Sequence, residues 1–169
     1  MPLKHSKPPP KRNNNHDNRT RTQQVLIKAT REKAFRVFTE RVDTWWPRAH
    51  HIGKSPLKQA VLESGEGGRW YTQHEDGSET NTGRVLVCEP PSRLVLSWQI
   101  NSQWQFDPDF LTEVEVTFTP QGQGETLVKI EHRNLERYGD ATAALRESIN
   151  SEGGWSAIMS AFAKAAESD

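Results

Sequence analysis

The side chain best suited to acid–base chemistry in this sequence is a histidine on an alternating pattern. His132 follows Val128 and Ile130 at every second position, so a strand here would place all three side chains on one inward face. An imidazole titrates near neutral pH, and it could act as a general base or bind a polar group of a ligand. Arg69 or Tyr71 would then be the candidate to polarise a substrate. The alternative is that His132 is a hydrogen-bonded core residue.

Large aromatic residues are the second signal, because the chain contains 6 tryptophans. Rings with polar edges suit an apolar pocket that orients a ligand through a few hydrogen bonds. The alternative is that the same rings fill the interior and leave no pocket. The candidate ligand-binding set is Trp45, Trp70, Trp98, Trp104, Phe106, Phe118, His132, Trp155, Met159 and Phe162.

Other reactive patterns are weak. Cys88 is the only cysteine, which excludes an internal disulfide and a multi-cysteine metal site. His50 and His51 are adjacent, and adjacent residues of a strand point to opposite faces, so we predict no metal site. Gly53-Lys54-Ser55 is similar to the end of a phosphate loop, but Arg48 stands where that motif requires glycine. We expect no cofactor, and whether the protein is an enzyme stays open, with binding favoured over catalysis.

Length and composition bound the class of protein. A chain of 169 residues is suited to one domain. Its formal net charge of zero argues against specific nucleic-acid binding. No run approaches the ~18 apolar residues that a membrane-spanning helix needs. We therefore expect a cytoplasmic protein without a membrane span.

The charge is distributed unevenly along the chain. Residues 1–23 hold six basic side chains and one acidic one, and residues 24–169 hold 16 basic and 21 acidic ones. The first segment also contains Pro8-Pro9-Pro10 and Asn13-Asn14-Asn15, and it has too few apolar residues to bury a core. We predict a disordered basic tail over residues 1–23 and a single domain over residues 24–169.

The regular elements needed to position these side chains can be predicted from periodicity. Phe35, Phe38, Val42 and Trp45 share one helical face, and Pro47 should end that helical stretch. A second helical pattern begins after Asp140 and is interrupted before a longer one over residues 155–166. Alternating, turn-bounded strands are predicted at residues 24–29, 57–63, 69–75, 83–88, 93–100, 111–119 and 126–132.

These elements predict an α+β fold. It consists of a curved antiparallel sheet of six to seven strands, two short helices after the first strand, and a long C-terminal helix packed on the concave face. One amphipathic helix and one sheet with a single apolar face need each other for burial. The tryptophan-bearing helix would cover the sheet, and the candidate ligand would lie between them.

Several stretches resemble the START/birch-pollen-allergen-like (SRPBCC) superfamily, whose fold is called helix-grip, and within it the branch related to activators of heat-shock-protein-90 ATPase. They are Ala34-Phe35-Arg36-Val37-Phe38-Thr39, Gly67-Gly68-Arg69-Trp70-Tyr71, Gly83-Arg84-Val85, Glu89-Pro90-Pro91-Ser92-Arg93-Leu94, residues 112–118, and Gly153-Gly154-Trp155. The resemblance covers about residues 24–166. It implies a mostly apolar cavity between the sheet and the closing helix, in which members bind lipids, hormones or polyketides.

The resemblance leaves three functions to compare. The first is a protein that holds a small apolar or aromatic ligand in the cavity. The second is a co-chaperone or other protein-interaction role, although eukaryotic activators carry a further folded domain where this chain has only residues 1–23. The third is a cyclase or hydrolase that uses His132. A cavity closed by packed tryptophans would favour the second function, and an open one with polar groups around His132 would favour the third.

Overall fold

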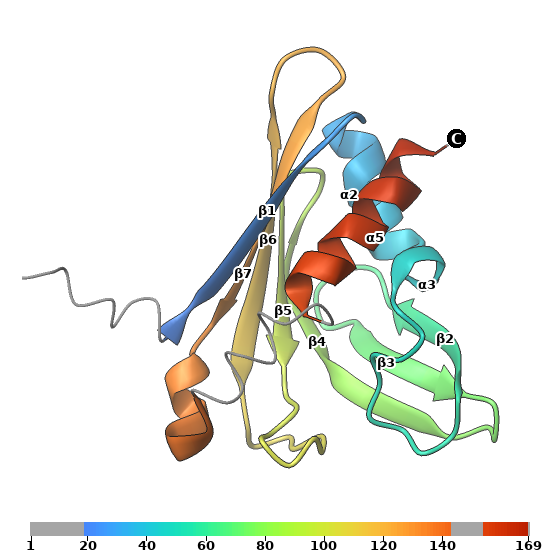
Figure 1. The fold of residues 1–169 in the computed structure, drawn as a ribbon, viewed down its shortest axis with the longest axis vertical. Helices are drawn as coiled ribbons and strands as arrows, with labels where there is room; N and C mark the ends of the chain where they lie inside the picture. The colour runs from blue at the N-terminus through green and yellow to red at the C-terminus, as the bar shows by residue number, and fades with distance from the viewer. Residues whose placement is uncertain (1–18, 143–153, 169) are drawn as a thin grey trace, which may run out of the picture.

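The computed structural model describes residues 19–142 and 154–168. Within these residues, seven strands form one antiparallel sheet in the order β1-β7-β6-β5-β4-β3-β2. The sheet curls around the helices, and α5 lies across its inner face (Figure 1). The strands are β1 (Arg21–Ile27), β2 (Leu57–Leu62), β3 (Arg69–His74), β4 (Glu79–Glu89), β5 (Arg93–Trp98), β6 (Thr112–Pro120) and β7 (Thr126–Arg133). This is the helix-grip arrangement that the sequence predicts.

Two short helices follow the first strand, as expected. α2 (Arg31–Glu40) begins at Thr30, whose hydroxyl accepts a hydrogen bond from the backbone N–H of Lys33 at 3.2 Å, which is a standard N-cap. α3 (Val42–Trp45) ends two residues before Pro47, and Trp46 is extended, because the residue before a proline is disfavoured in the helical region. Both helices turn their apolar side chains toward the sheet.

The closing helix, α5 (Trp155–Glu167), is 13 residues long and therefore spans about 20 Å. It packs against β1, α2 and α3, and these contacts hold it over the concave face of the sheet. Its buried residues recur at helical spacing: Trp155, Ile158, Met159, Phe162 and Ala166. The predicted amphipathic pattern over residues 155–166 is therefore confirmed.

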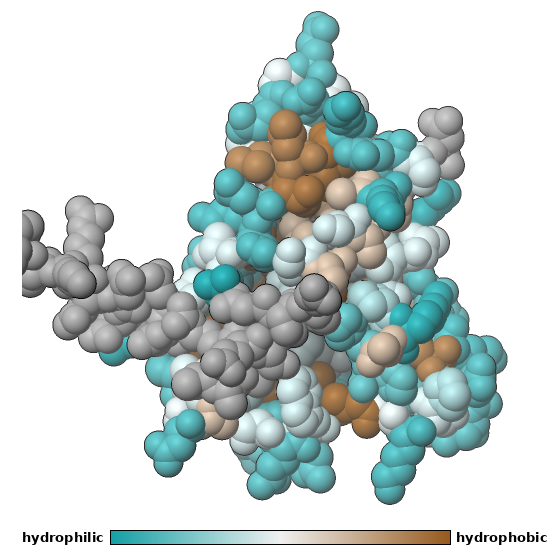
Figure 2. Space-filling view, viewed as in Figure 1, coloured by the Kyte–Doolittle hydropathy of each residue, from teal (hydrophilic) through white to brown (hydrophobic). Residues whose placement is uncertain are grey.

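The sheet has one apolar and one charged face in its central part. Val114, Val116 and Phe118 of β6 are buried, while the residues between them reach solvent. On the outer face, Arg93 and Arg133 both form ion pairs with Glu115, at 2.6 and 3.5 Å. Figure 2 shows that the face in view is mostly hydrophilic, with a hydrophobic patch in the upper part of the molecule. The alternation predicted from the sequence is confirmed for β6 and β7.

The sheet bends near Gly83, just before β4 passes from pairing with β3 (up to Arg84) to pairing with β5 (from Val85). A side chain at this position would overlap the backbone carbonyl oxygen of Ser97 on β5. The register also shifts beside it, between Trp70 and Tyr71 of β3. Such irregularities increase local bending. The bend directs β2 and β3 away from the rest of the sheet (Figure 1).

Some elements differ from the prediction. β1 begins at Arg21, so residues 21–23 belong to the sheet and not to the predicted tail, because pairing with β7 orders a segment whose composition is polar. A 3₁₀ helix, η1 (Leu135–Ala141), follows β7 and was not predicted. The predicted tail residues 1–18 and most of the predicted helix 141–149 lie outside the described residues.

Replacing Gly83 with alanine should lower the free energy of unfolding by about 2–3 kcal/mol, because a methyl group forces β4 and β5 apart. Gly122→Ala is the matched control, since Gly122 has a φ of 75° and open space around its Cα, so that only backbone strain of about 1 kcal/mol applies. Urea denaturation measures both variants. Equal losses for the two would contradict the close approach of the strands at Gly83.

Candidate functional site

The space under the middle of α5 is filled by aromatic rings. Phe38 packs on Trp45, Phe118 and Phe162 with ring centroids 4.9, 5.9 and 5.2 Å apart. Among the described residues, the void next to this cluster measures only about 10 Å³, too little for more than one water. The predicted deep cavity is therefore closed at this point, and these rings are core residues.

An open pocket lies at one end of this packed interior. Its volume is about 250 Å³, and we call it the tryptophan pocket. Its walls come from the loop after α3, strands β3 to β5, the loop after β5, and α5. The lining residues are Trp46, Ala49, His50, His51, Ile52, Thr72, Thr82, Trp98, Ile100, Trp104 and Ile158. Three indoles and few polar groups suit a small ligand with an aromatic or otherwise apolar body.

The loop after α3, which forms one wall of the pocket, is held in place by hydrogen bonds between side chains and backbone carbonyls. The indole N–H of Trp46 donates to the carbonyl of His50 at 2.7 Å, which closes the loop on itself. The carbonyl of Ser55 lies 3.0 Å from Nδ1 of His74, and the ring of His74 packs directly against Gly53. A larger residue at position 53 would collide with that ring. The loop that forms the pocket wall is thus positioned by β3.

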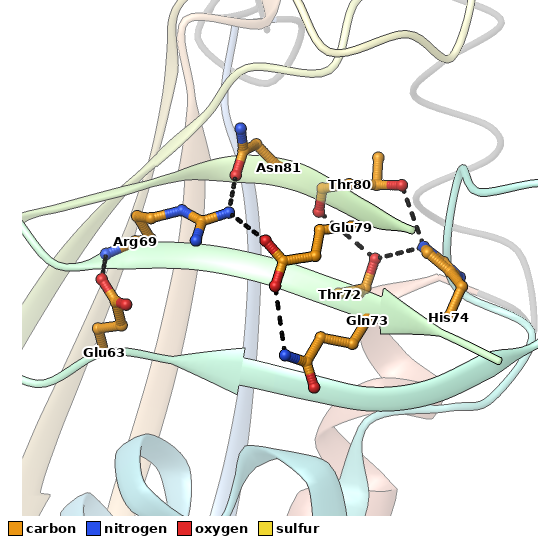
Figure 3. Close-up of polar contacts among 8 residues, drawn as sticks. All are labelled: Glu63, Arg69, Thr72, Gln73, His74, Glu79, Thr80 and Asn81. Carbon is orange, nitrogen blue, oxygen red and sulfur yellow. Dashed lines mark hydrogen bonds and ion pairs between the residues drawn. The ribbon is translucent and has the colours of Figure 1, made fainter. Parts of the chain in front are cut away.

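His74 also connects two threonine hydroxyls inside the sheet (Figure 3). A carbonyl only accepts, so the bond to Ser55 places a proton on Nδ1 of His74. Nε2 lies within hydrogen-bond distance of the hydroxyls of Thr72 and Thr80, each at 3.0 Å. His74 is 1% exposed, and this network satisfies both of its nitrogens. Thr72, on the pocket wall, is therefore held in a fixed orientation.

Two imidazoles, His50 and His51, line the pocket from the loop after α3. Nδ1 of His50 and Nδ1 of His51 are buried and have no hydrogen-bond partner among the described residues. Burial and the neighbouring His74, whose ring centroid lies 5.0 Å away, lower the pKa of His51 below its usual value. A neutral imidazole nitrogen can accept a hydrogen bond. In the described structure, however, neither Nδ1 atom is accessible to solvent.

Trp104 stands at the mouth of the pocket in an unusual conformation. Its φ is 57°, in the left-handed region that a bulky residue rarely adopts. The side-chain oxygen of Asn101 accepts from the backbone N–H groups of Gln103 and Gln105, at 3.0 and 3.1 Å, and so brackets this turn. The indole remains 51% exposed. Strained residues of this kind cluster at binding sites, and an exposed ring beside a pocket suits ligand stacking.

His132 lies behind Trp98 and not on the pocket wall. The indole N–H of Trp155 donates to Nδ1 of His132 at 3.3 Å, so neutral His132 carries its proton on Nε2 and donates to the Thr112 hydroxyl at 2.9 Å. That hydroxyl donates in turn to the carbonyl of Trp98 at 2.8 Å. Burial lowers the pKa of His132 to about 3. With both nitrogens used, His132 acts as a core residue here.

The structure separates the predicted ligand-binding residues into three groups. Trp98 and Trp104 line the tryptophan pocket. Phe106 is half-buried and forms an isolated bridge with Ile100 beside it. The remaining residues form the packed interior: Trp45, Trp70, Phe118, His132, Trp155, Met159 and Phe162.

Arg69 and Tyr71 do not line the pocket either. The guanidinium of Arg69 lies 3.9 Å from the centre of the Tyr71 ring. It also donates to Glu79 and Asn81, at 3.2 and 2.9 Å (Figure 3). These contacts occupy the group proposed to polarise a substrate.

Sequence reasoning missed most of the pocket walls. Thr72 and His74 alternate with Trp70 along β3, which is a signal that could have placed them on the inner face. No sequence pattern of this kind marks the loop around His51 as a pocket wall, because the position of this loop depends on its contacts with His74. Among the described residues, no group of three or more potential ligands could hold a metal ion. No helix in the same part of the chain is long and apolar enough to span a membrane.

The chain's relatives agree with this architecture. The family model described as "Activator of Hsp90 ATPase homolog 1-like protein" matches residues 28–167. The chain belongs to this family. No curated protein sequence matches it significantly.

Solved structures with similar folds include two with appreciable sequence identity. One is the anthrahydroquino-gamma-pyrone synthase Txn09 complexed with SUM, 34% identical over 87% of this chain and 96% of that one, with a TM-score of 0.62. Another is CalC from Micromonospora echinospora, a self-sacrificing resistance protein, 32% identical over 88% and 94% with a TM-score of 0.66. Protein NE0264 from Nitrosomonas europaea, at 14% identity and a TM-score of 0.65, covers 89% and 95% and shares the fold.

The burial of His132 predicts that its imidazole stays neutral well below its usual pKa. Its folded pKa of about 3 lies below the ordinary value of 6.5, so between these values only the unfolded chain binds the proton. The contribution of His132 to the free energy of unfolding should therefore decrease as the pH falls, by up to about 1.4 kcal/mol per pH unit.

Nitrogen and carbon NMR shifts of the ring report this directly. We expect the Nε2-protonated form and no titration of His132 above about pH 4. The spectrum of His132→Gln assigns the signal. A midpoint near the ordinary histidine value, or a proton on Nδ1, would contradict the hydrogen-bond chain from Trp155 to Trp98.

Proposed function

We propose that the protein binds a small aromatic or apolar molecule bearing hydroxyl or carbonyl groups in the tryptophan pocket. The observation that carries this proposal is the composition of the walls, in which Trp46, Trp98 and Trp104 surround a hollow of about 250 Å³. That volume is just below the ~300–1,000 Å³ typical of pockets for drug-sized ligands. The pocket therefore suits a ligand of one to a few rings.

The polar groups of the pocket determine what the ligand could carry. The imidazoles of His50 and His51 line the pocket and give its wall a polar part that could face a ligand hydroxyl. The hydroxyl of Thr82 on β4 can donate to a carbonyl. Among the residues that the structure describes, the walls include no carboxylate and no lysine or arginine, so a neutral ligand is favoured over a charged one.

The relatives support a ligand-binding role without identifying the ligand. The synthase Txn09 is described as complexed with SUM, and CalC as a resistance protein. Both are more than 30% identical to this chain over most of its length. A shared fold hosts different activities, so the site must identify the function. We propose binding as the function here, since the nitrogens of His132 are both engaged.

A protein-interaction role is the second candidate. It is supported by the family description, which refers to activators of the Hsp90 ATPase, and by the aromatic rings that close the interior under α5. A protein-interaction role does not require that a ligand bind in the tryptophan pocket. Native mass spectrometry of freshly purified protein tests the two roles, because a co-purified small molecule favours ligand binding.

The exposed ring of Trp104 provides the sharpest test of the pocket. Trp104→Ala should weaken the binding of 2-naphthol about tenfold, because it removes a stacking surface. Calorimetric titration measures the dissociation constant. The free energy of unfolding should change little, since the ring is 51% exposed and its loss leaves no buried cavity.

Leu26→Ala is the matched control, because Leu26 is similarly exposed, at 50%, and lies on β1 outside the pocket. It should leave the binding of 2-naphthol unchanged. Equal affinity in the Trp104 variant and the unmodified protein, or no binding of any aromatic probe, would count against the tryptophan pocket as the site.

A further inference from the structure

A second, larger hollow lies on the far side of α2 from the tryptophan pocket. Its volume is about 740 Å³, and we call it the α2 groove. It runs between α2, the turn that joins β2 to β3, and the adjoining ends of β4 and β5. It shares no lining residue with the tryptophan pocket. The two hollows are therefore separate sites.

The floor of the α2 groove is apolar and firmly packed. Phe35, Leu62 and Leu94 line it and are each at most 9% exposed. The ring of Phe35 contacts Phe118 edge-on, with centroids 5.2 Å apart, so the floor is anchored in the main core. An apolar body resting here would be desolvated against a surface that does not need to rearrange.

The rim of the groove is strongly acidic. Glu32 and Glu40 lie on α2, Glu63 and Glu66 lie on the β2–β3 turn, and Arg36 is the one cation among the lining residues. The net charge of the lining is therefore −3. Glu32 and Glu40 are eight residues apart, which corresponds to about 12 Å along the helix. Negative charge thus flanks the groove along its length and attracts cations.

The rim carboxylates have few partners of their own. Glu32 lies 3.8 Å from Arg31, and Glu63 accepts a hydrogen bond from the backbone N–H of Arg69 at 2.7 Å. Glu40 and Glu66 form no ion pair with any residue that the structure describes. These two carboxylates remain available to a cation bound in the groove.

We propose that the α2 groove binds a small organic cation, with an apolar body over Phe35, Leu62 and Leu94 and an ammonium or guanidinium group at Glu40 and Glu66. The apolar floor supplies affinity through burial. The acidic rim selects the sign of the charge, because an anion of the same shape would be repelled. This ligand class differs from the neutral one that the tryptophan pocket suits, so the protein has two sites of different specificity.

The chain carries a natural reporter for this site. Cys88 is its only cysteine, and it is half-buried and lines the groove. A bound molecule should therefore slow the alkylation of Cys88 by a neutral reagent such as iodoacetamide. Three probes with one apolar body separate charge from burial: 1-naphthylmethylammonium, 1-naphthylmethanol and 1-naphthoate.

We expect the cationic probe to protect Cys88 at a concentration about tenfold lower than the neutral alcohol, and the anion to give no protection. Glu40→Gln combined with Glu66→Gln should remove the tenfold preference and leave protection by the alcohol unchanged. The matched control, Glu75→Gln combined with Glu136→Gln, removes two exposed carboxylates outside both hollows and should retain the preference.

Several outcomes would overturn the proposal. Equal protection by all three probes would show an apolar hollow without charge selection. Loss of protection in Trp104→Ala would place the probe in the tryptophan pocket. A further variant replaces four basic residues with glutamine in the full chain: Lys4, Lys7, Lys11 and Arg12. If Cys88 of this variant is alkylated faster without any probe, the occupant of the α2 groove is the chain's own basic segment. Retained preference in the double glutamine variant of the rim would exclude Glu40 and Glu66 as the cation's partners.

Discussion

The contact between Trp155 and His132 determines how the interior of this protein is divided. Trp155 is the first residue of α5, and its indole N–H needs an acceptor because the ring is only 4% exposed. The buried nitrogen of His132 on β7 provides it. The Trp155 ring also contacts those of Trp46 and Trp98, with centroids 6.4 and 5.9 Å apart. The helix therefore begins at the edge of the tryptophan pocket, and Ile158 becomes part of its wall.

Packing on either side of that contact explains why the open pocket is displaced from the expected position. Further along α5, Phe162 meets Phe38 and Trp45 at 5.2 Å, and no useful space remains. At the Trp155 end of α5, the surface that faces the sheet is the loop after α3. This loop is tethered through Trp46 and His74, and it cannot interdigitate with the sheet as a helix does. The tryptophan pocket therefore stays open where the sheet faces this loop and not a helix. We infer that the tethering of the loop, rather than the number of aromatic rings, decides where space remains.

Periodicity in the sequence predicts the elements and their inward faces, but it does not predict whether the faces leave room. The alternation of Val114, Val116 and Phe118 requires only a sheet with one wet side, and it predicts β6 correctly. Whether Phe118 fills the interior depends on the position of Phe38 on another element. The same limit applies to His132, which alternation places inward. Its role depends on the partners at both nitrogens, and these come from β6 and α5.

The filled core between the two hollows has a consequence for their energetics. The rings of Phe38, Trp45 and Phe118 lie between the α2 groove and the tryptophan pocket without a void that a ligand could enter. Sites that share no lining residue and are separated by close-packed side chains usually respond to substitutions additively. Coupling between them would require α2 to shift against the sheet, and Phe35 and Phe38 both oppose this through their contacts with Phe118. Each site should therefore be able to bind its ligand without changing the affinity of the other.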